Sequence, residues 1–122
     1  MTKKVLVADD EPNIVISLEF LLRREGFEVL IAVDGEEALS KARSARPDLV
    51  LLDVMMPKMN GFDVCQALRA DPEFSAMRIL MLTAKGRDAE VSKGLGLGAD
   101  AYMTKPFSSK ELVVQVRSLL GL

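Results

Sequence analysis

The sequence predicts one α/β domain in which five parallel strands form a doubly wound sheet and five helices cover its two faces. Short apolar runs alternate with longer stretches of helical periodicity along all 122 residues. This alternation is typical of a parallel sheet, because a crossover helix must return the chain before the next strand can pair. The length favours an open sheet over an eight-stranded barrel, which takes about 250 residues.

Five apolar runs are the expected strands. Each is four to six residues long, which suits a strand that is covered by helices on both faces. The runs are KVLVA (4–8), FEVLIA (27–32), DLVLL (48–52), RILML (78–82) and DAYM (100–103).

The first two helices are expected at residues 12–25 and directly after Asp34. The first has apolar residues at helical spacing, and Gly26 follows it as a stop signal. Asp34-Gly35 alone would be typical of a hairpin turn, but Glu37 lies three residues after Asp34, as in a capping box. We therefore expect Asp34 to open a helix.

The other three helices are expected at about 61–70, near 87–97 and from Ser108 to Leu120. Glu111 completes a second capping box with Ser108. The segment near 87–97 runs into the sequence GLGLG, in which each glycine costs about 1 kcal/mol relative to alanine in a helix interior. We expect this helix to be the least stable of the five.

The composition restricts the class of protein. Hydrophobic content of 49% with 28% charged residues is typical of a soluble globular domain, and a net charge of −2 provides no basic surface for nucleic acid. No apolar stretch reaches the length of a membrane span, and the first strand begins at Lys4, which leaves no room for a signal peptide. We expect a cytoplasmic protein without direct contact to nucleic acid or membrane.

The sequence contains no histidine and one cysteine, Cys65. The absence of histidine excludes Ser-His-Asp and Cys-His catalysis and histidine-containing zinc sites. A single cysteine cannot form an intramolecular disulfide, and its helical surroundings predict a small buried core residue. Carboxylates, hydroxyls and lysines remain for chemistry.

Polar side chains follow four of the expected strands at the point where each strand ends. They are Asp9 and Asp10, Asp53, Thr83 and Lys105. In a parallel sheet all carboxyl ends lie at one edge, where open α/β folds bind their ligands. Three carboxylates in one place need positive charge, which a lysine and a Mg²⁺ ion would supply. The pattern predicts Mg²⁺-assisted phosphoryl transfer to a carboxylate, which gives an aspartyl phosphate.

Each of these residues also has a simpler interpretation. Asp10, followed by Glu11-Pro12, can cap the first helix, Thr83 can belong to a turn, and Lys105 can be a solvated surface lysine. Their joint placement favours the functional interpretation.

These residues carry a specific resemblance to the receiver domains of two-component response regulators. The resemblance extends from Lys4 to Leu120, and its motifs are Asp9-Asp10, Asp53 within DVMMPKMNG, Thr83-Ala84 and Lys105-Pro106. It implies a flavodoxin-like fold with strand order 2-1-3-4-5 and one receiver domain over residues 1–122. The sequence contains no effector domain, so we expect either a stand-alone regulator that relays its signal by binding or a piece of a longer protein. The implied partners are a sensor histidine kinase or histidine phosphotransfer protein and a downstream protein target.

By this resemblance Asp53 accepts the phosphoryl group from a phosphohistidine. Mg²⁺ would be bound by Asp53 itself, by Asp10 directly, by Asp9 mostly through water, and by the backbone carbonyl of Met55. The chain would assist its own phosphorylation and slow dephosphorylation without being an enzyme.

The resemblance also implies a switch. Thr83 and Lys105 would bind phosphoryl oxygens, the Lys105–Pro106 bond would be cis, and Tyr102 would turn inward when Thr83 moves toward the phosphoryl group. The fourth helix, the last strand and the last helix would then form the face that binds the partner.

The sequence departs from the family pattern in two places. Met55 and Lys85 flank the expected path of the hydrolytic water and neither orients a water, so we expect slow self-dephosphorylation. Val91, Ala101 and Gln115 stand where dimers of related DNA-binding regulators use charge, so that dimer is disfavoured. We expect a monomer, with a weak phosphorylation-dependent dimer as the alternative.

Two other activities share the expected fold. A haloacid-dehalogenase-like phosphatase needs a second Asp where Met55 stands, and more chain for a substrate cap. A flavodoxin-like binding module needs a hydroxyl-rich phosphate loop after the first strand and aromatic residues to stack a flavin, whereas the chain has one Tyr and no Trp.

Overall fold

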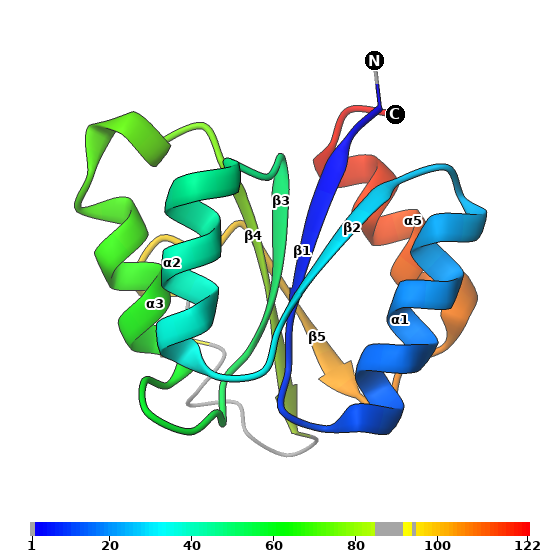
Figure 1. The fold of residues 1–122 in the computed structure, drawn as a ribbon, viewed down its shortest axis with the longest axis horizontal. Coiled ribbons are helices and arrows are strands. Elements are labelled where there is room, and N and C mark those ends of the chain that lie inside the picture. The colour runs from blue at the N-terminus through cyan, green and yellow to red at the C-terminus, as the bar shows by residue number, and fades with distance from the viewer. Residues whose placement is uncertain (1, 85–91, 94) are drawn as a thin grey trace.

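The computed structural model describes residues 2–84, 92, 93 and 95–122. Its five strands are parallel and lie in the order β2-β1-β3-β4-β5, as predicted (Figure 1). Their bounds are β1 Lys4–Ala8, β2 Glu28–Ala32, β3 Leu49–Asp53, β4 Arg78–Ala84 and β5 Ala101–Lys105.

Four α-helices have complete bounds within the described part of the chain. They are α1 Pro12–Arg24, α2 Gly35–Ala45, α3 Gly61–Arg69 and α5 Ser109–Leu119. A short 3-10 helix, Pro72–Phe74, follows α3 and was not predicted from the sequence. The helix predicted near 87–97 lies mostly outside the described residues, and its described residues 92, 93, 95 and 96 are helical. No helix among the described residues is long and apolar enough to cross a membrane.

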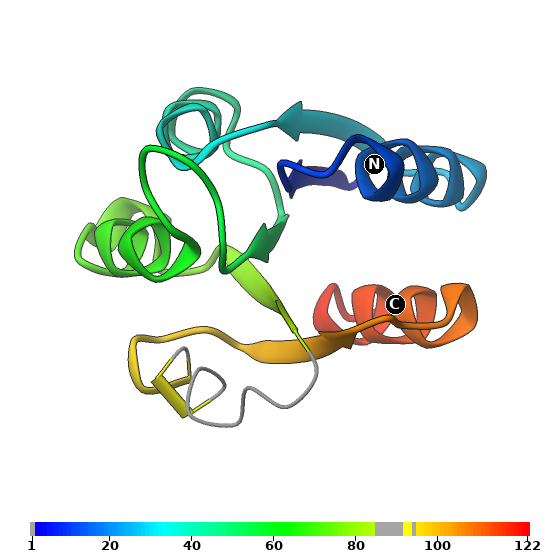
Figure 2. The ribbon, with the colours of Figure 1, turned by 90° about the horizontal axis from the view of Figure 1, so that it is seen from below.

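The sheet is the middle of three layers. Helices α2 and α3 cover one face and α1 and α5 the other (Figure 2). Alternate residues of a strand enter different cores, so Val50 and Leu52 pack toward α2 and α3 whereas Leu49 and Leu51 pack toward α1 and α5. All four are fully buried, and burial of each such side chain stabilises the fold by about 1.5–3 kcal/mol. Cys65 of α3 is buried in the first core, as predicted.

Asp34 and Ser108 are the N-caps of α2 and α5, as predicted, although among the described residues only the N-cap half of each predicted capping box is present. The side chain of Asp34 accepts a hydrogen bond from the backbone N–H of Glu37 at 2.8 Å, and Ser108 accepts one from the N–H of Glu111 at 3.0 Å. Such a cap contributes about 1 kcal/mol to a helix. Asp34-Gly35 therefore begins a helix and not a hairpin.

Three strands extend one or two residues further than predicted, so that functional candidates stand within the sheet and not after it. Asp53 ends β3, Lys105 ends β5, and Thr83 is the penultimate residue of β4. Neighbouring strands offer partners at these positions, because Asp53 is in register with Leu82 and Lys105 with Ala84. The carboxyl edge of the sheet lies at the end of the molecule opposite both chain termini (Figure 1).

Candidate functional site

Asp53 and Lys105 lie on the same face of the sheet at its carboxyl edge. Side chains alternate between faces along a strand, and Leu51 and Met103, two residues earlier in each strand, both belong to the core under α1 and α5. The alternation of side chains thus places the carboxylate of Asp53 and the ammonium of Lys105 on the face of the sheet that α1 and α5 cover.

Asp9, Asp10 and Asp53 form a compact acidic cluster at this edge. One carboxylate oxygen from each lies within 4.8 Å of the others. Lys105 joins them, with its Nζ 2.8 Å from Asp9 Oδ2 and 3.4 Å from Asp53 Oδ1. The structure therefore brings together four of the five polar residues that the strand ends predict.

Asp9 is fully buried, and its two carboxylate oxygens have different partners. Its Oδ1 accepts a hydrogen bond from the backbone N–H of Glu11 at 2.9 Å. Its Oδ2 lies close to Lys105 but accepts no well-directed hydrogen bond from any described residue. A buried carboxylate oxygen with so few partners carries a desolvation cost that a bound cation would offset.

The electrostatics of Asp53 point the same way. Burial, together with the nearby charge of Asp9, raises the pKa of Asp53 to about 7, although Lys105 and the backbone of Met55 act in the opposite direction. A carboxylate that is hard to ionise at neutral pH needs more positive charge than one lysine provides.

The cluster fits a Mg²⁺ ion. Mg²⁺ binds oxygen ligands octahedrally at about 2.1 Å and usually keeps several waters, so a carboxylate can hold it directly or through a bound water. The three carboxylate oxygens lie within 4.8 Å of one another, a spacing that allows them to share one hydrated ion. Asp9, Asp10 and Asp53 supply the hard anionic ligands that this ion prefers.

Lys105 is surrounded by more negative charge than the sequence predicted. Burial alone would lower the pKa of its ammonium, but contacts with Asp9, Asp53 and Glu11 outweigh burial and raise the pKa. Glu11 Oε1 lies 3.3 Å from Lys105 Nζ. From the sequence, Glu11 was expected only as part of a helix cap, although its position directly after Asp9-Asp10 was a signal for a role in the site. The Lys105–Pro106 bond is cis, as predicted.

The loop between β3 and α3 passes tightly over Asp53. The N–H of Gly61 donates to the carbonyl of Val54 at 2.9 Å, and a Cβ on Gly61 would overlap the backbone of Asp53. A Cβ on Gly35, the first residue of α2, would overlap the backbone carbonyl of Met59 in this loop. The close approach at Gly35 was not predicted, because it depends on how α2 packs against the loop.

Thr83 lies at the same edge of the sheet but on the strand positions that face α2 and α3. Met81, two residues earlier, belongs to that core, and Thr83 itself is buried. Its hydroxyl lies 3.5 Å from the carbonyl oxygen of Ala84. Met81 is in register with Tyr102 of β5, so Thr83 and Tyr102 lie on the same face of neighbouring strands.

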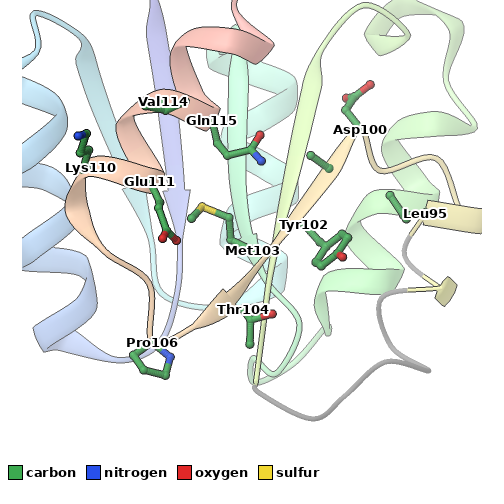
Figure 3. A pocket seen from close by; sticks show the side chains of 11 residues that line it. Leu95, Asp100, Tyr102, Met103, Thr104, Pro106, Lys110, Glu111, Val114 and Gln115 are labelled. Carbon is green, nitrogen blue, oxygen red and sulfur yellow. The ribbon is translucent and has the colours of Figure 1, made fainter.

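Tyr102 is 44% exposed and lines a groove beside β5 and α5 (Figure 3). Val114 of α5 lies across the groove, and Leu95 lies on the Tyr102 side. These apolar side chains stand between polar ones, including Asp100 and Glu111. Exposed apolar side chains that are interspersed with polar ones are typical of a protein-binding surface.

The remaining candidates are placed as follows. Met55 is exposed at the site, and Ala101 and Gln115 are half-buried and line the groove beside α5. Lys85 and Val91 lie outside the described residues, so the expectations about water access and dimer charge rest on sequence at those two positions.

Residues 5–117 match the model of the response regulator receiver domain. The Bacillus subtilis protein PhoP, an alkaline phosphatase synthesis transcriptional regulatory protein, is 51% identical over 98% of this chain and 49% of its own length. The chain thus spans about half the length of the curated relatives it matches.

Solved structures agree with the sequence comparison. The Vibrio cholerae chemotaxis response regulator CheY4 is 35% identical with a TM-score of 0.91, covering 98% of this chain and 99% of that one. The receiver domain of the Pseudomonas aeruginosa sensor histidine kinase PA1611, solved with a magnesium ion coordinated in its active site cleft, is 27% identical over the whole of both chains with a TM-score of 0.91. The chain therefore belongs to the family of response regulator receiver domains.

Proposed function

We propose that residues 1–122 act as one phosphorylation switch in which Asp53 is the phosphoryl acceptor. The observation that carries this proposal is the convergence of three carboxylates and Lys105 at the carboxyl edge of the sheet. An oxygen of Asp53 would attack phosphorus, and the bond between phosphorus and the donor would break as the acyl phosphate forms. The donor is a phosphohistidine on a sensor kinase or a histidine phosphotransfer protein.

Mg²⁺ is the proposed cofactor. Asp10 and Asp53 would hold it directly, Asp9 mostly through water, and the backbone carbonyl of Met55 would complete the protein's ligands. When bound, the ion neutralises charge on the transferred group and on the crowded carboxylates. The magnesium ion in the PA1611 receiver supports this assignment.

Thr83 and Lys105 would convert the phosphoryl group into a conformational signal. A phosphoryl group adds about −1.5 to −2 charge, and two charge-assisted hydrogen bonds contribute about 3–6 kcal/mol. Inversion of a 1:99 equilibrium takes about 5.5 kcal/mol, so these two contacts are of the required size. Tyr102 would turn inward and alter the groove beside α5, where a downstream protein would bind.

The rival activities have less support. The family match covers residues 5–117, whereas a haloacid-dehalogenase-like phosphatase or a flavodoxin-like module has no matching observation here. We further propose that the chain is a phosphoacceptor with slow self-dephosphorylation and not a turnover enzyme, because Met55 offers no group to orient a water. Relatives such as MtrA are named DNA-binding response regulators, but this chain covers only about half of their length. Because its net charge is −2, we propose that residues 1–122 do not contact nucleic acid directly.

The direct test is incubation with acetyl phosphate in the presence and absence of Mg²⁺. We expect one phosphoryl group per chain with Mg²⁺ and almost none after chelation, read by intact-protein mass spectrometry. Continuous release of phosphate from generic esters, without a stable adduct, would favour a phosphatase instead.

Thr83→Ala tests the switch separately from the chemistry. The variant should be phosphorylated nearly as well as the unaltered chain, because Asp53 and the acidic cluster remain, but its groove should not respond. Fluorine NMR on a fluorotyrosine at Tyr102 reads the response. A full shift of the Tyr102 signal in phosphorylated Thr83→Ala would contradict the proposed coupling.

A further inference from the structure

The ammonium of Lys105 has three carboxylate neighbours that differ in kind. Asp9 and Asp53 lie 2.8 and 3.4 Å from Nζ and belong to the acidic cluster proposed to bind Mg²⁺. Glu11 lies 3.3 Å away and stands outside that cluster. A cation that binds the cluster would therefore take two of the three partners of Lys105 and leave the third.

The side chain of Glu11 has no other structural task among the described residues. Glu11 is the N-cap residue of α1, yet its carboxylate makes no capping hydrogen bond. Its backbone N–H serves Asp9, while its carboxylate is 60% exposed and turns to Lys105, ninety-four residues away in sequence. Glutamate is not one of the residues preferred for capping with the side chain, which leaves this carboxylate available for Lys105.

Mg²⁺ and the Lys105 ammonium are both cations, and both would bind carboxylate oxygens of Asp9 and Asp53. Lys105 contacts Asp9 Oδ2 and Asp53 Oδ1, so it opposes the entry of a dication unless it can withdraw from both. If Lys105 withdrew into water, it would leave the place where an incoming phosphoryl group needs it. Glu11 offers a nearby anion at the mouth of the site.

We infer that Glu11 is a positioning residue that holds Lys105 at the mouth of the site while Mg²⁺ occupies the acidic cluster. This inference rests on the proposed function, since it assumes that the cluster binds Mg²⁺. Glu11 would relieve competition between the ammonium and the metal, and would keep the ammonium ready for the phosphoryl oxygens. Its action on the metal is indirect, through Lys105.

The test is a double-mutant cycle on Mg²⁺ affinity, measured by calorimetry without any phosphodonor. The four proteins are the unaltered chain, Glu11→Gln, Lys105→Gln and the double variant, in about 0.3 M KCl so that long-range charge effects are screened. Glu11→Gln should weaken Mg²⁺ binding about two- to five-fold when Lys105 is present, the size expected for an exposed ion pair. In the Lys105→Gln background the same change should alter affinity less than about 1.5-fold. Glu28→Gln, an exposed carboxylate at the start of β2, is the matched control and should have no effect.

A second measurement does not depend on the fold of the Lys105 variants. In ¹⁵N-lysine NMR of the Mg²⁺-loaded protein, the Lys105 ammonium signal should remain that of an ion-paired group and should become solvent-exchanged in Glu11→Gln. Equal effects of Glu11→Gln in both backgrounds, or an unchanged ammonium signal, would overturn the inference while leaving the proposed function intact. Failure of the unaltered chain to bind Mg²⁺ would overturn both.

Discussion

Asp53→Ala is expected to abolish phosphorylation by acetyl phosphate completely. Asp53 is the carboxylate that β3 carries to the carboxyl edge, within 3.4 Å of Lys105 and beside Asp9 and Asp10. Asp10 keeps its carboxylate in this variant, but its side chain is exposed, whereas the side chain of Asp53 is buried beside Lys105. Because an acyl phosphate requires a carboxylate at that position, the adduct in the mass spectrum should fall from one per chain to none.

Asp63→Ala is the matched control for this experiment. Asp63 is an exposed carboxylate in the first turn of α3, so its loss should leave labelling intact. Persistent stoichiometric labelling of Asp53→Ala would mean that a different residue is the acceptor and would refute the assignment.

Asp53→Asn is expected to stabilise the metal-free protein at pH 8 and to change its stability little at pH 4. Burial and Asp9 raise the pKa of Asp53 to about 7 in the folded state, whereas the unfolded value is about 3.9. The folded state therefore binds this proton more tightly, and the resulting stability is present below pH 4 and is lost as the pH rises through about 7. At pH 8 the unaltered chain bears the full cost, which asparagine removes.

The size of this effect follows from the pKa difference. The difference between the folded pKa of about 7 and the unfolded pKa of about 3.9 corresponds to at most about 4 kcal/mol of unfolding free energy. Solvent screening at the mouth of the site reduces the expected difference to about 1–3 kcal/mol. Urea unfolding followed by circular dichroism at pH 4 and pH 8, with chelator present, measures the difference between the two proteins. Saturating Mg²⁺ should narrow the gap at pH 8, because the ion stabilises the ionised carboxylates.

Glu28→Gln again provides the control, since Glu28 begins β2 at the opposite edge of the sheet and is exposed. The difference in unfolding free energy between Glu28→Gln and the unaltered chain should be about the same at pH 4 and pH 8. A difference between Asp53→Asn and the unaltered chain that is equal at pH 4 and pH 8 would show that the ionisation of Asp53 carries no such cost.

Local patterns in the sequence were sufficient for the architecture. Runs such as DLVLL specify strands that are apolar on both faces, and the Asp34 and Ser108 capping boxes mark helix starts, because each depends on interactions within a few residues. The ends of β3, β4 and β5 were predicted too short, because their last residues are polar and are kept in the sheet by neighbouring strands. In a sequence, a polar residue after an apolar run is usually taken to mark the end of the strand.

The residues that reach the carboxyl edge could be predicted from the order of apolar runs, because alternating strands and helices place all strand ends on one side. Their contacts at this edge depend on tertiary packing. The pairing of Glu11 with Lys105 joins positions ninety-four residues apart, and the need for glycine at Gly35 arises where α2 meets the loop after β3. Contacts of this kind depend on how separate elements pack and on which charges share a buried space, and no short-range pattern encodes either.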